Sequence, residues 1–526
     1  MTSSTWHQPR EHAVVTLARN VTTRYVLVIV NVLIGLIMLR FNVQHLGKDT
    51  YGLWMLATSL TSYFTVLDFG YGSAVIRYVA EFKARRDVRS LNEVLSTMSY
   101  VFTAVGVGCY ALAIAVAILL PWIFNLEPDQ IRTGRLVILM TGLQVALFFP
   151  FSIYGGVINA FERFYVNNVV GLVFNVVTAL VNVLVLTLGY GLVELVACTT
   201  VLRILPFWIY RWNAYQVFPA LELRRQHVRL ARLRELSGYS FSVAVVDWAT
   251  RLTYATDAFF LGVLMNTAAV GLFAVAQRIS DTLLTLTHQI HTFMMPKVVH
   301  RAIDGGTAPQ RDLMIRATRF QLAIAMCLCG GIATVADTLI RAWLGPGWDA
   351  SIRVTQILAA SVVLRAVIAM PTTMLQGTGD HRFVSVASAW SAALNLVLTV
   401  VFIHLWGITG TAIATLTASA LCVVLIFPRS CRAVGLSWQA GIGATIIPAF
   451  WPAVVAVACM ITLQQSLPGG LLAVLGNLVV GGGVYAAVFF LFGLDRDERL
   501  WFVGLCHRVF NRQAPVRAVS DVVGSR

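Results

Sequence analysis

Charged residues are scarce in this chain, and acidic residues are the scarcest of them. Of 526 residues only 12% are charged, with 24 aspartates and glutamates against 39 lysines and arginines, whereas 58% are hydrophobic. The mean hydropathy is +0.76. Because soluble domains carry about 25% charged residues, this composition excludes a soluble enzyme and a soluble binding domain.

Several signatures of other function classes are also missing. The sequence contains no Walker-type loop with its lysine, so we expect no nucleotide-driven motor. The eight cysteines are scattered, and the spacing of Cys327 and Cys329 places their thiols on different helix faces, so we expect neither disulfides nor a metal site. Asp495-Arg496-Asp497 has the D-x-D form of a sugar-nucleotide site but stands alone, which favours a solvated helix start. We therefore predict no cofactor and no enzymatic activity.

Long apolar runs are abundant. Runs of about 20 residues can cross roughly 30 Å of hydrocarbon, and lipid offers the backbone no hydrogen-bond partners, so they must be helical. We predict an all-α polytopic membrane protein with about fourteen transmembrane helices, at residues 22–44, 51–80, 95–120, 134–157, 166–188, 192–216, 238–263, 269–295, 316–340, 352–376, 383–405, 408–428, 440–463 and 469–492.

The lysines and arginines predict the orientation of these helices. With the N-terminus in the cytoplasm, the inward loops collect most loop cations, including the clusters at 83–89 and 224–234. An excess of positive charge marks cytoplasmic loops, so we expect both termini inside. The net charge of +15 is then explained by orientation and by attraction to anionic membrane lipids, and no nucleic-acid partner is expected.

Short similarities recur at nearly constant offset. YGLW at 51–54 resembles VGLF at 270–273, and ERF at 162–164 resembles HRF at 381–383, both 219 residues apart. Six spans per repeat give two lobes of equal topology, the parallel-repeat arrangement of transporters. We predict an N-terminal lobe (1–216), a cytoplasmic amphipathic linker (217–236) that forms an interfacial helix, a C-terminal lobe (237–430), and two added helices with a cytoplasmic tail (431–526).

Four motifs resemble one transporter family. They are LGKDTYGLWMLATSLTSYFTVLDFGYGSAVIRYVAEF (46–82), LIRAWLGPGW (339–348), MLQGTGDHR (374–382) and GITGTAIATL (407–416). Together they resemble the oligosaccharide and polysaccharide flippases of the multidrug/oligosaccharidyl-lipid/polysaccharide (MOP) exporter superfamily, over the chain to about residue 430. The motifs consist mostly of glycine and apolar residues, so they specify the fold better than the cargo.

The resemblance implies a flippase in a bacterial inner membrane. Its cargo would be an undecaprenyl-pyrophosphate-linked oligosaccharide repeat unit for surface polysaccharide, moved by alternating access. Partners would be the lipid-linked oligosaccharide, membrane lipids, and polysaccharide polymerase and glycosyltransferases. Coupling to H⁺ or Na⁺ stays open. The alternatives are a cation-coupled multidrug exporter, which would favour an acidic, aromatic cavity, and a membrane glycan polymerase or ligase, which would need a longer outward loop.

Polar residues inside the predicted spans are the candidates for contacting such cargo. An anionic head crossing the bilayer midplane is costly unless cations line its path, and guanidinium groups match phosphate oxygens. Asn20, Arg24 and Asn31 share one helix face, as do Arg278 and Asp281. The predicted substrate-binding residues are Arg24, Asn31, Asp68, Asp247, Arg251, Arg278, Asp281 and Arg365.

Other interpretations of these residues stay open. Asp247 with Arg251, and Arg278 with Asp281, have the spacing of ion pairs within a helix. The arginines Arg24, Arg77 and Arg203 can instead extend to an interface. Asp68 either faces the central cleft or pairs with an arginine across it, and His288 and His291 are either packed or proton-handling.

Overall fold

The computed structural model describes residues 10–64, 67, 78–79, 81–82, 85–124, 126–161, 163–229, 256–304, 307–377, 380–466, 470–496 and 498–500. Those residues are helical or irregular, with no strand among them. Twelve of their helices are long and apolar enough to cross a membrane. The predicted all-α polytopic fold is confirmed.

The chain divides into two compact units. The first contains residues 1–282, 343–358 and 382–422, and the second contains 283–342, 359–381 and 423–526. Helices that belong partly to each unit are α8 (Thr267–Asp304), α9 (Thr307–Leu344), α10 (Asp349–Gly377), α11 (His381–Trp406) and α12 (Ile408–Ala433). The predicted lobe boundaries stay a prediction.

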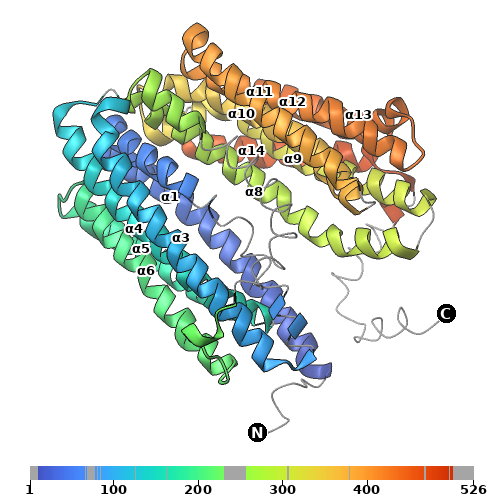
Figure 1. Ribbon diagram of the computed structural model, residues 1–526. Helices are drawn as coiled ribbons and strands as arrows, with labels where there is room; N and C mark the ends of the chain where they lie inside the picture. The colour runs from blue at the N-terminus through green and yellow to red at the C-terminus, as the bar shows by residue number, and fades with distance from the viewer. Residues whose placement is uncertain are drawn as a thin grey trace. The chain divides into compact units, whose positions relative to one another are not determined.

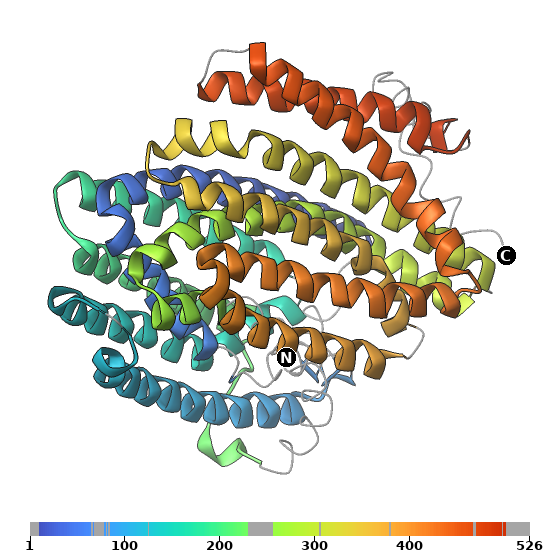
Figure 2. The ribbon, with the colours of Figure 1, turned by 90° about the horizontal axis from the view of Figure 1, so that it is seen from above.

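Five helices at the N-terminal end of the first unit form one bundle. α3 (Val88–Ile123) packs on α4 (Pro128–Ala160), which packs on α6 (Leu192–Val217); α1 (Arg10–Phe64) packs on α4 and on α5 (Phe164–Thr187). Figures 1 and 2 show these blue-to-green helices side by side. Their apolar faces bury Leu95, Phe102, Ile138 and Phe149 at 1% exposure or less, which fixes the positions of the polar residues described below.

Helix α1 joins the first two predicted spans. It has 55 residues, and its only non-helical position is Gly47, with φ 75° and ψ 176°. A residue with a side chain rarely adopts that φ, so glycine allows the chain to turn there without strain. The turn falls between the predicted spans 22–44 and 51–80, as expected. Of the second span, the structure describes helix to Phe64 and a few residues beyond.

The second half of α1 touches the start of α8 without intervening side chains. A methyl group at Gly52 would overlap the carbonyl oxygen of Thr267, and one at Gly271 would overlap the carbonyl oxygen of Lys48. Lys48 Nζ also lies 5.5 Å from the ring centre of Trp348, at the start of α10. The two helices therefore pack backbone to backbone at this end of the first unit.

Polar side chains of α3 hold the segment that follows α6. Asn92 Nδ2 donates to the carbonyl of Ala220 (2.8 Å), and its Oδ1 accepts from the Glu222 N–H (3.1 Å). Ser96 Oγ donates to the Glu222 carbonyl (3.1 Å) and accepts from the Arg224 N–H (3.3 Å). These side chains form hydrogen bonds only with main-chain groups of the segment. They satisfy its backbone donors and acceptors, as a paired strand does in a sheet.

The predicted interfacial helix is absent from residues 218–229. They form a turn at 219–220 and one 3₁₀ turn, η3 (Arg225–His227), and are otherwise irregular; Thr97 Oγ1 accepts from the N–H of Arg229 (2.9 Å). The expectation of a helix was wrong there, because α3 supplies the hydrogen bonds that helix formation would otherwise provide. Residues 230–236 lie outside the described residues, and the cytoplasmic location of the linker stays a prediction.

The second unit has its own core and its own buried ion cluster. Residues of α9, α10, α12, α13 (Trp438–Ser466) and α14 (Leu471–Val488) pack together, and a π-helical turn (Phe489–Gly493) closes α14. Arg319 Nη1 lies 3.0 Å from Glu498 and 3.1 Å from Asp495, and its Nε donates to the Ala444 carbonyl. Asp495 is therefore an ion-pair partner, not merely a solvated helix start.

Candidate functional site

A polar cavity of about 680 Å³ opens within the first unit. Four of the bundle helices line it, and α8 contributes one residue. The lining side chains are Asn31, Ile34, Gly35, Met38, Leu39, Asn42, Tyr51, Trp54, Met55, Thr58, Thr61 and Ser62 of α1, Thr141, Gln144 and Val145 of α4, Asn175, Thr178, Ala179 and Asn182 of α5, Val196, Thr199, Thr200 and Arg203 of α6, and Arg278 of α8.

Two arginines give this cavity its charge. Arg203 and Arg278 are both exposed, and each lies eleven residues after the first residue of its helix, Leu192 and Thr267 respectively. At 1.5 Å per residue that is about 16 Å, near the middle of a hydrocarbon layer of about 30 Å. Both arginines line the same cavity. Among the described residues that line the cavity there is no aspartate or glutamate.

Gly35 makes room for Arg278. A methyl group at position 35 would overlap Nη2 of Arg278 and would lie 3.1 Å from its Cζ. The guanidinium group therefore rests directly on the backbone of α1. The guanidinium N–H donors that do not face Gly35 can donate to phosphate oxygens in the cavity.

The cavity wall also carries polar atoms without partners. Asn175 Nδ2 donates to Asn31 Oδ1 at 2.8 Å. In contrast, Asn42 Oδ1, Asn182 Oδ1 and Thr200 Oγ1 are buried and make no hydrogen bond within the described part of the chain. Each unsatisfied polar group costs about 1–3 kcal/mol, so the cavity is suited to a polar ligand that bonds them.

A second cluster of oxygen atoms surrounds Asp257, which is 1% exposed and belongs to the helical residues 256–264. Thr399 Oγ1 donates to its Oδ1 (3.4 Å), and Thr415 Oγ1 donates to its Oδ2 (3.1 Å). Next to them, Asn395 Oδ1 and Thr411 Oγ1 are buried without a partner in the described structure. A buried carboxylate among amide and hydroxyl oxygens offers hard ligands to a cation.

The comparison with protein families identifies the chain's relatives. A family model described as "Polysaccharide biosynthesis protein" matches residues 43–353, more than half of the chain. The chain belongs to this family. A probable low-salt glycan biosynthesis flippase, Agl15 of Haloferax volcanii, is 22% identical over 169 residues, which cover 32% of this chain and 36% of that relative. The match thus spans little more than a third of the relative's length.

Two solved structures share the fold of this polysaccharide biosynthesis protein. The lipid II flippase MurJ in an inward closed conformation gives a TM-score of 0.71 at 12% identity, covering 93% of this chain and 99% of MurJ. An inward-facing multidrug resistance MATE family transporter of the MOP superfamily gives 0.61 at 14% identity, covering 79% and 96%. The family match supports the predicted link to polysaccharide biosynthesis, and the two structural likenesses concern the fold.

The structure brings two of the predicted binding residues together in this family member. Asn31 and Arg278 line the same cavity, whereas Arg24 is exposed on α1 and is not part of the lining. Arg365 is half-buried in the part of α10 that belongs to the second unit. Asp68, Asp247 and Arg251 lie outside the described residues, as does Arg77. Substrate binding by all eight stays a prediction.

The alternative interpretation of Arg278 and Asp281 as an ion pair is not the arrangement observed. Asp281 accepts a hydrogen bond from Gln277 Nε2 at 2.8 Å, and no salt bridge joins these two described residues, Arg278 and Asp281. Arg278 is therefore available to the cavity. Arg203 is not among the predicted binding residues, because a long side chain in a span can also extend to an interface, and the sequence does not distinguish the two cases.

Proposed function

We propose that the chain is a flippase that carries a lipid-linked oligosaccharide with an anionic, pyrophosphate-type head through the cavity of Arg203 and Arg278. The observation that carries this proposal is the pair of exposed arginines at mid-depth in a polar cavity whose described lining contains no acidic residue. Such a site lowers the cost of bringing phosphate charge into a medium of low dielectric constant. The unpartnered amide and hydroxyl atoms would bond the sugar or the phosphate.

The same lining disfavours the alternative of an exporter for cationic drugs. A cation would meet two positive charges and no described carboxylate in this cavity. We also propose transport, and not polymerase or ligase chemistry, as the activity. The family membership supports a role in polysaccharide biosynthesis, with glycosyltransferases that supply the cargo and a polymerase that consumes it as partners. We place the protein in the bacterial inner membrane with both termini in the cytoplasm.

We propose in addition that the Asp257 cluster couples transport to a gradient of H⁺ or Na⁺. Buried Asn395 Oδ1 and Thr411 Oγ1 make no hydrogen bond within the described residues, and together with the Asp257 carboxylate they form a set of oxygens suited to a small cation. A bound cation would neutralise the carboxylate in its buried position. Protonation of Asp257 would do the same and would turn the carboxyl into a donor.

The experiment uses the full-length protein in proteoliposomes with a fluorescent polyprenyl diphosphate as probe. Arg203→Ala or Arg278→Ala should reduce flipping at least tenfold, whereas Arg→Lys should retain part of it, since lysine keeps the charge without the two-pronged fit. The control is Arg211→Ala, an exposed residue of α6 that lies 5.7 Å from the Trp208 ring and outside the cavity. Undiminished flipping in both alanine variants would contradict the proposal.

A further inference from the structure

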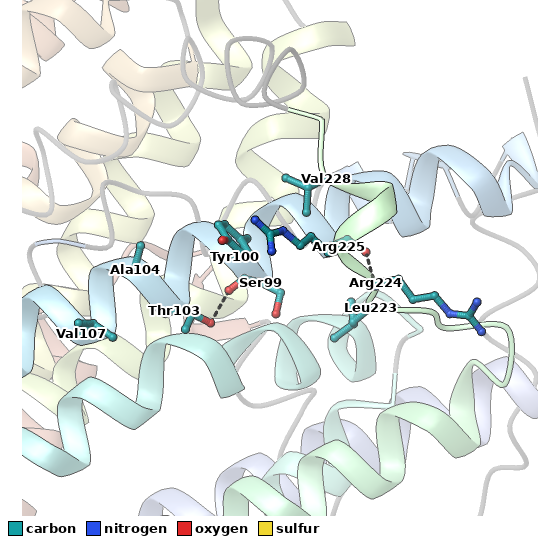
Figure 3. A pocket seen from close by; sticks show the side chains of 10 residues that line it. Ser99, Tyr100, Thr103, Ala104, Val107, Leu223, Arg224, Arg225 and Val228 are labelled. Atoms are coloured by element: carbon teal, nitrogen blue, oxygen red, sulfur yellow. Dashed lines mark hydrogen bonds between the residues drawn. The ribbon is translucent and has the colours of Figure 1, made fainter.

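A second cleft, of about 490 Å³, lies between α3 and the segment after α6 (Figure 3). It shares no lining residue with the transport cavity. One end is polar and cationic, and the other is apolar and strongly exposed, with Val107 67% exposed. The lining residues are Ser96, Ser99, Tyr100, Thr103, Ala104, Val107, Leu223, Arg224, Arg225 and Val228.

The cationic end consists of Arg224 and Arg225, which are both exposed. Arg224 Nε lies 3.4 Å from Glu222, a pair so solvent-exposed that it contributes little. Arg225 has no ion-pair partner among the described residues. Their backbone is fixed, because the Arg224 N–H donates to Ser96 Oγ and the Arg225 carbonyl accepts from the Val228 N–H at 3.2 Å. Figure 3 shows the Arg225 side chain extending toward Tyr100 and the Arg224 side chain extending away from it, so both cations belong to this end of the cleft but only Arg225 lies beside Tyr100.

The apolar end continues along the exposed face of α3. Ala104, Val107, Ala111, Ile114 and Ile118 recur at spacings of three and four residues, which places them in one stripe, and all five are exposed. The stripe extends about 20 Å at 1.5 Å per residue, which is longer than the roughly 15 Å of one leaflet's hydrocarbon. A soluble anion could use the arginines but not this stripe, whereas an acyl chain would cover it.

We propose that this cleft binds one anionic phospholipid of the membrane. Its phosphate would lie beside Arg225, with Arg224 adding to the positive charge at this end, its ester region would lie beside Ser99 and Tyr100, and an acyl chain would lie along the stripe that begins at Ala104. A zwitterionic lipid carries its own cation and gains less from two arginines, so the site selects for net negative charge. The lipid would contact α3 and the segment 218–229 together and so add to the side-chain bonds between them.

The test is native mass spectrometry of the full-length protein with an equimolar mixture of phosphatidylglycerol and phosphatidylethanolamine. Wild type should retain phosphatidylglycerol selectively. Arg224→Gln with Arg225→Gln should weaken this binding roughly thirtyfold, since each cation near an anionic surface contributes about a factor of five. The control, Arg85→Gln with Arg89→Gln, removes the same charge from two exposed side chains outside the cleft and should change binding less than twofold.

Three results would overturn the proposal. Undiminished phosphatidylglycerol binding in the Arg224/Arg225 variant would show that the cleft is not the site. An equal loss of phosphatidylglycerol binding in the Arg224/Arg225 variant and in the Arg85/Arg89 control would show that the lipid responds only to the overall positive charge of the protein. Displacement of the lipid by excess inorganic phosphate would show that the cleft binds a phosphate ion. Unchanged melting of the variants in lipid-free detergent ensures that lost binding does not reflect lost folding.

Discussion

Gly52 and Gly271 are reciprocal partners. Gly52 faces the carbonyl of Thr267, and Gly271 faces the carbonyl of Lys48, so each glycine contacts the residue four positions before the other. Lys48 and Thr267, like the two glycines, are 219 residues apart, which is the offset of the sequence repeat. Exchanging the two repeats therefore exchanges the two glycine–carbonyl contacts. This is what a two-fold axis that relates the repeats requires.

We predict that Gly52→Ala or Gly271→Ala separates α1 from α8. An added methyl group would meet backbone, which cannot move aside, and overpacking of this kind costs about 1–3 kcal/mol of stability. Thermal unfolding of purified protein should show a lower melting temperature for both variants. Gly108→Ala is the control, because no atom lies within 4 Å of its added methyl group. Equal melting of all three would contradict the close contact.

Gly35→Ala should act through Arg278. The methyl group meets the end of a flexible side chain, so the protein should stay folded while the guanidinium group is displaced from the cavity wall. Flipping of the polyprenyl diphosphate should fall about as far as in Arg278→Ala. In the Arg278→Ala background, Gly35→Ala should cause no further loss of flipping. Such non-additivity is expected when one substitution acts through the other residue. Gly171→Ala, whose nearest neighbour atom would be 3.9 Å away, serves as control.

Asp257→Asn should uncouple transport from the driving gradient. The substitution keeps the shape and removes the charge that would attract a cation. Flipping should then no longer respond to an imposed Na⁺ or H⁺ gradient, and applying each gradient separately to wild type tells which ion is used. Asp337→Asn, an exposed carboxylate paired with Arg341 at 2.8 Å, should leave the response intact. A full response in Asp257→Asn would exclude the cluster as the coupling site.

Arg319→Ala should destabilise the second unit. Removing it leaves Glu498, at 4% exposure, without its main cation, and breaking a buried ion pair costs about 3–5 kcal/mol. Arg316→Ala should cost less than about 1 kcal/mol, because that side chain is 54% exposed and lies 3.7 Å from the same carboxylate. Thermal unfolding measures both. Adding Glu498→Gln to Arg319→Ala should recover part of the loss; no recovery would argue against the buried pair.

Much of the fold could be predicted from the sequence, because a lipid bilayer permits few backbone structures. Apolar runs in lipid must be helical, and the turn between the first two spans coincides with Gly47. Arg278 and Asn31 were found because polar residues inside a span are costly and therefore informative. Arg203 was underestimated, since position along a helix does not tell whether a long side chain faces a cavity or an interface.

The segment after α6 could not be predicted from local pattern. Its periodicity is that of an amphipathic helix, but Asn92 and Ser96 lie about 130 positions away in the sequence and bond its backbone. Such long-range bonds override local propensity, and they leave no trace in the segment's own composition. The reciprocal glycines were visible as a repeated motif, yet their contact required the folded chain.

The way α3 holds residues 218–229 sets what this segment can tolerate. Asn92, Ser96 and Thr97 bond its carbonyl and N–H groups and none of its side chains. Any residue but proline can present the same atoms at the bonded N–H positions. One residue more or fewer would instead shift each bonded atom away from its partner. Ordinary surface loops accept insertions readily. The segment between Val217 and Arg229 should therefore tolerate most substitutions but neither an insertion nor a deletion.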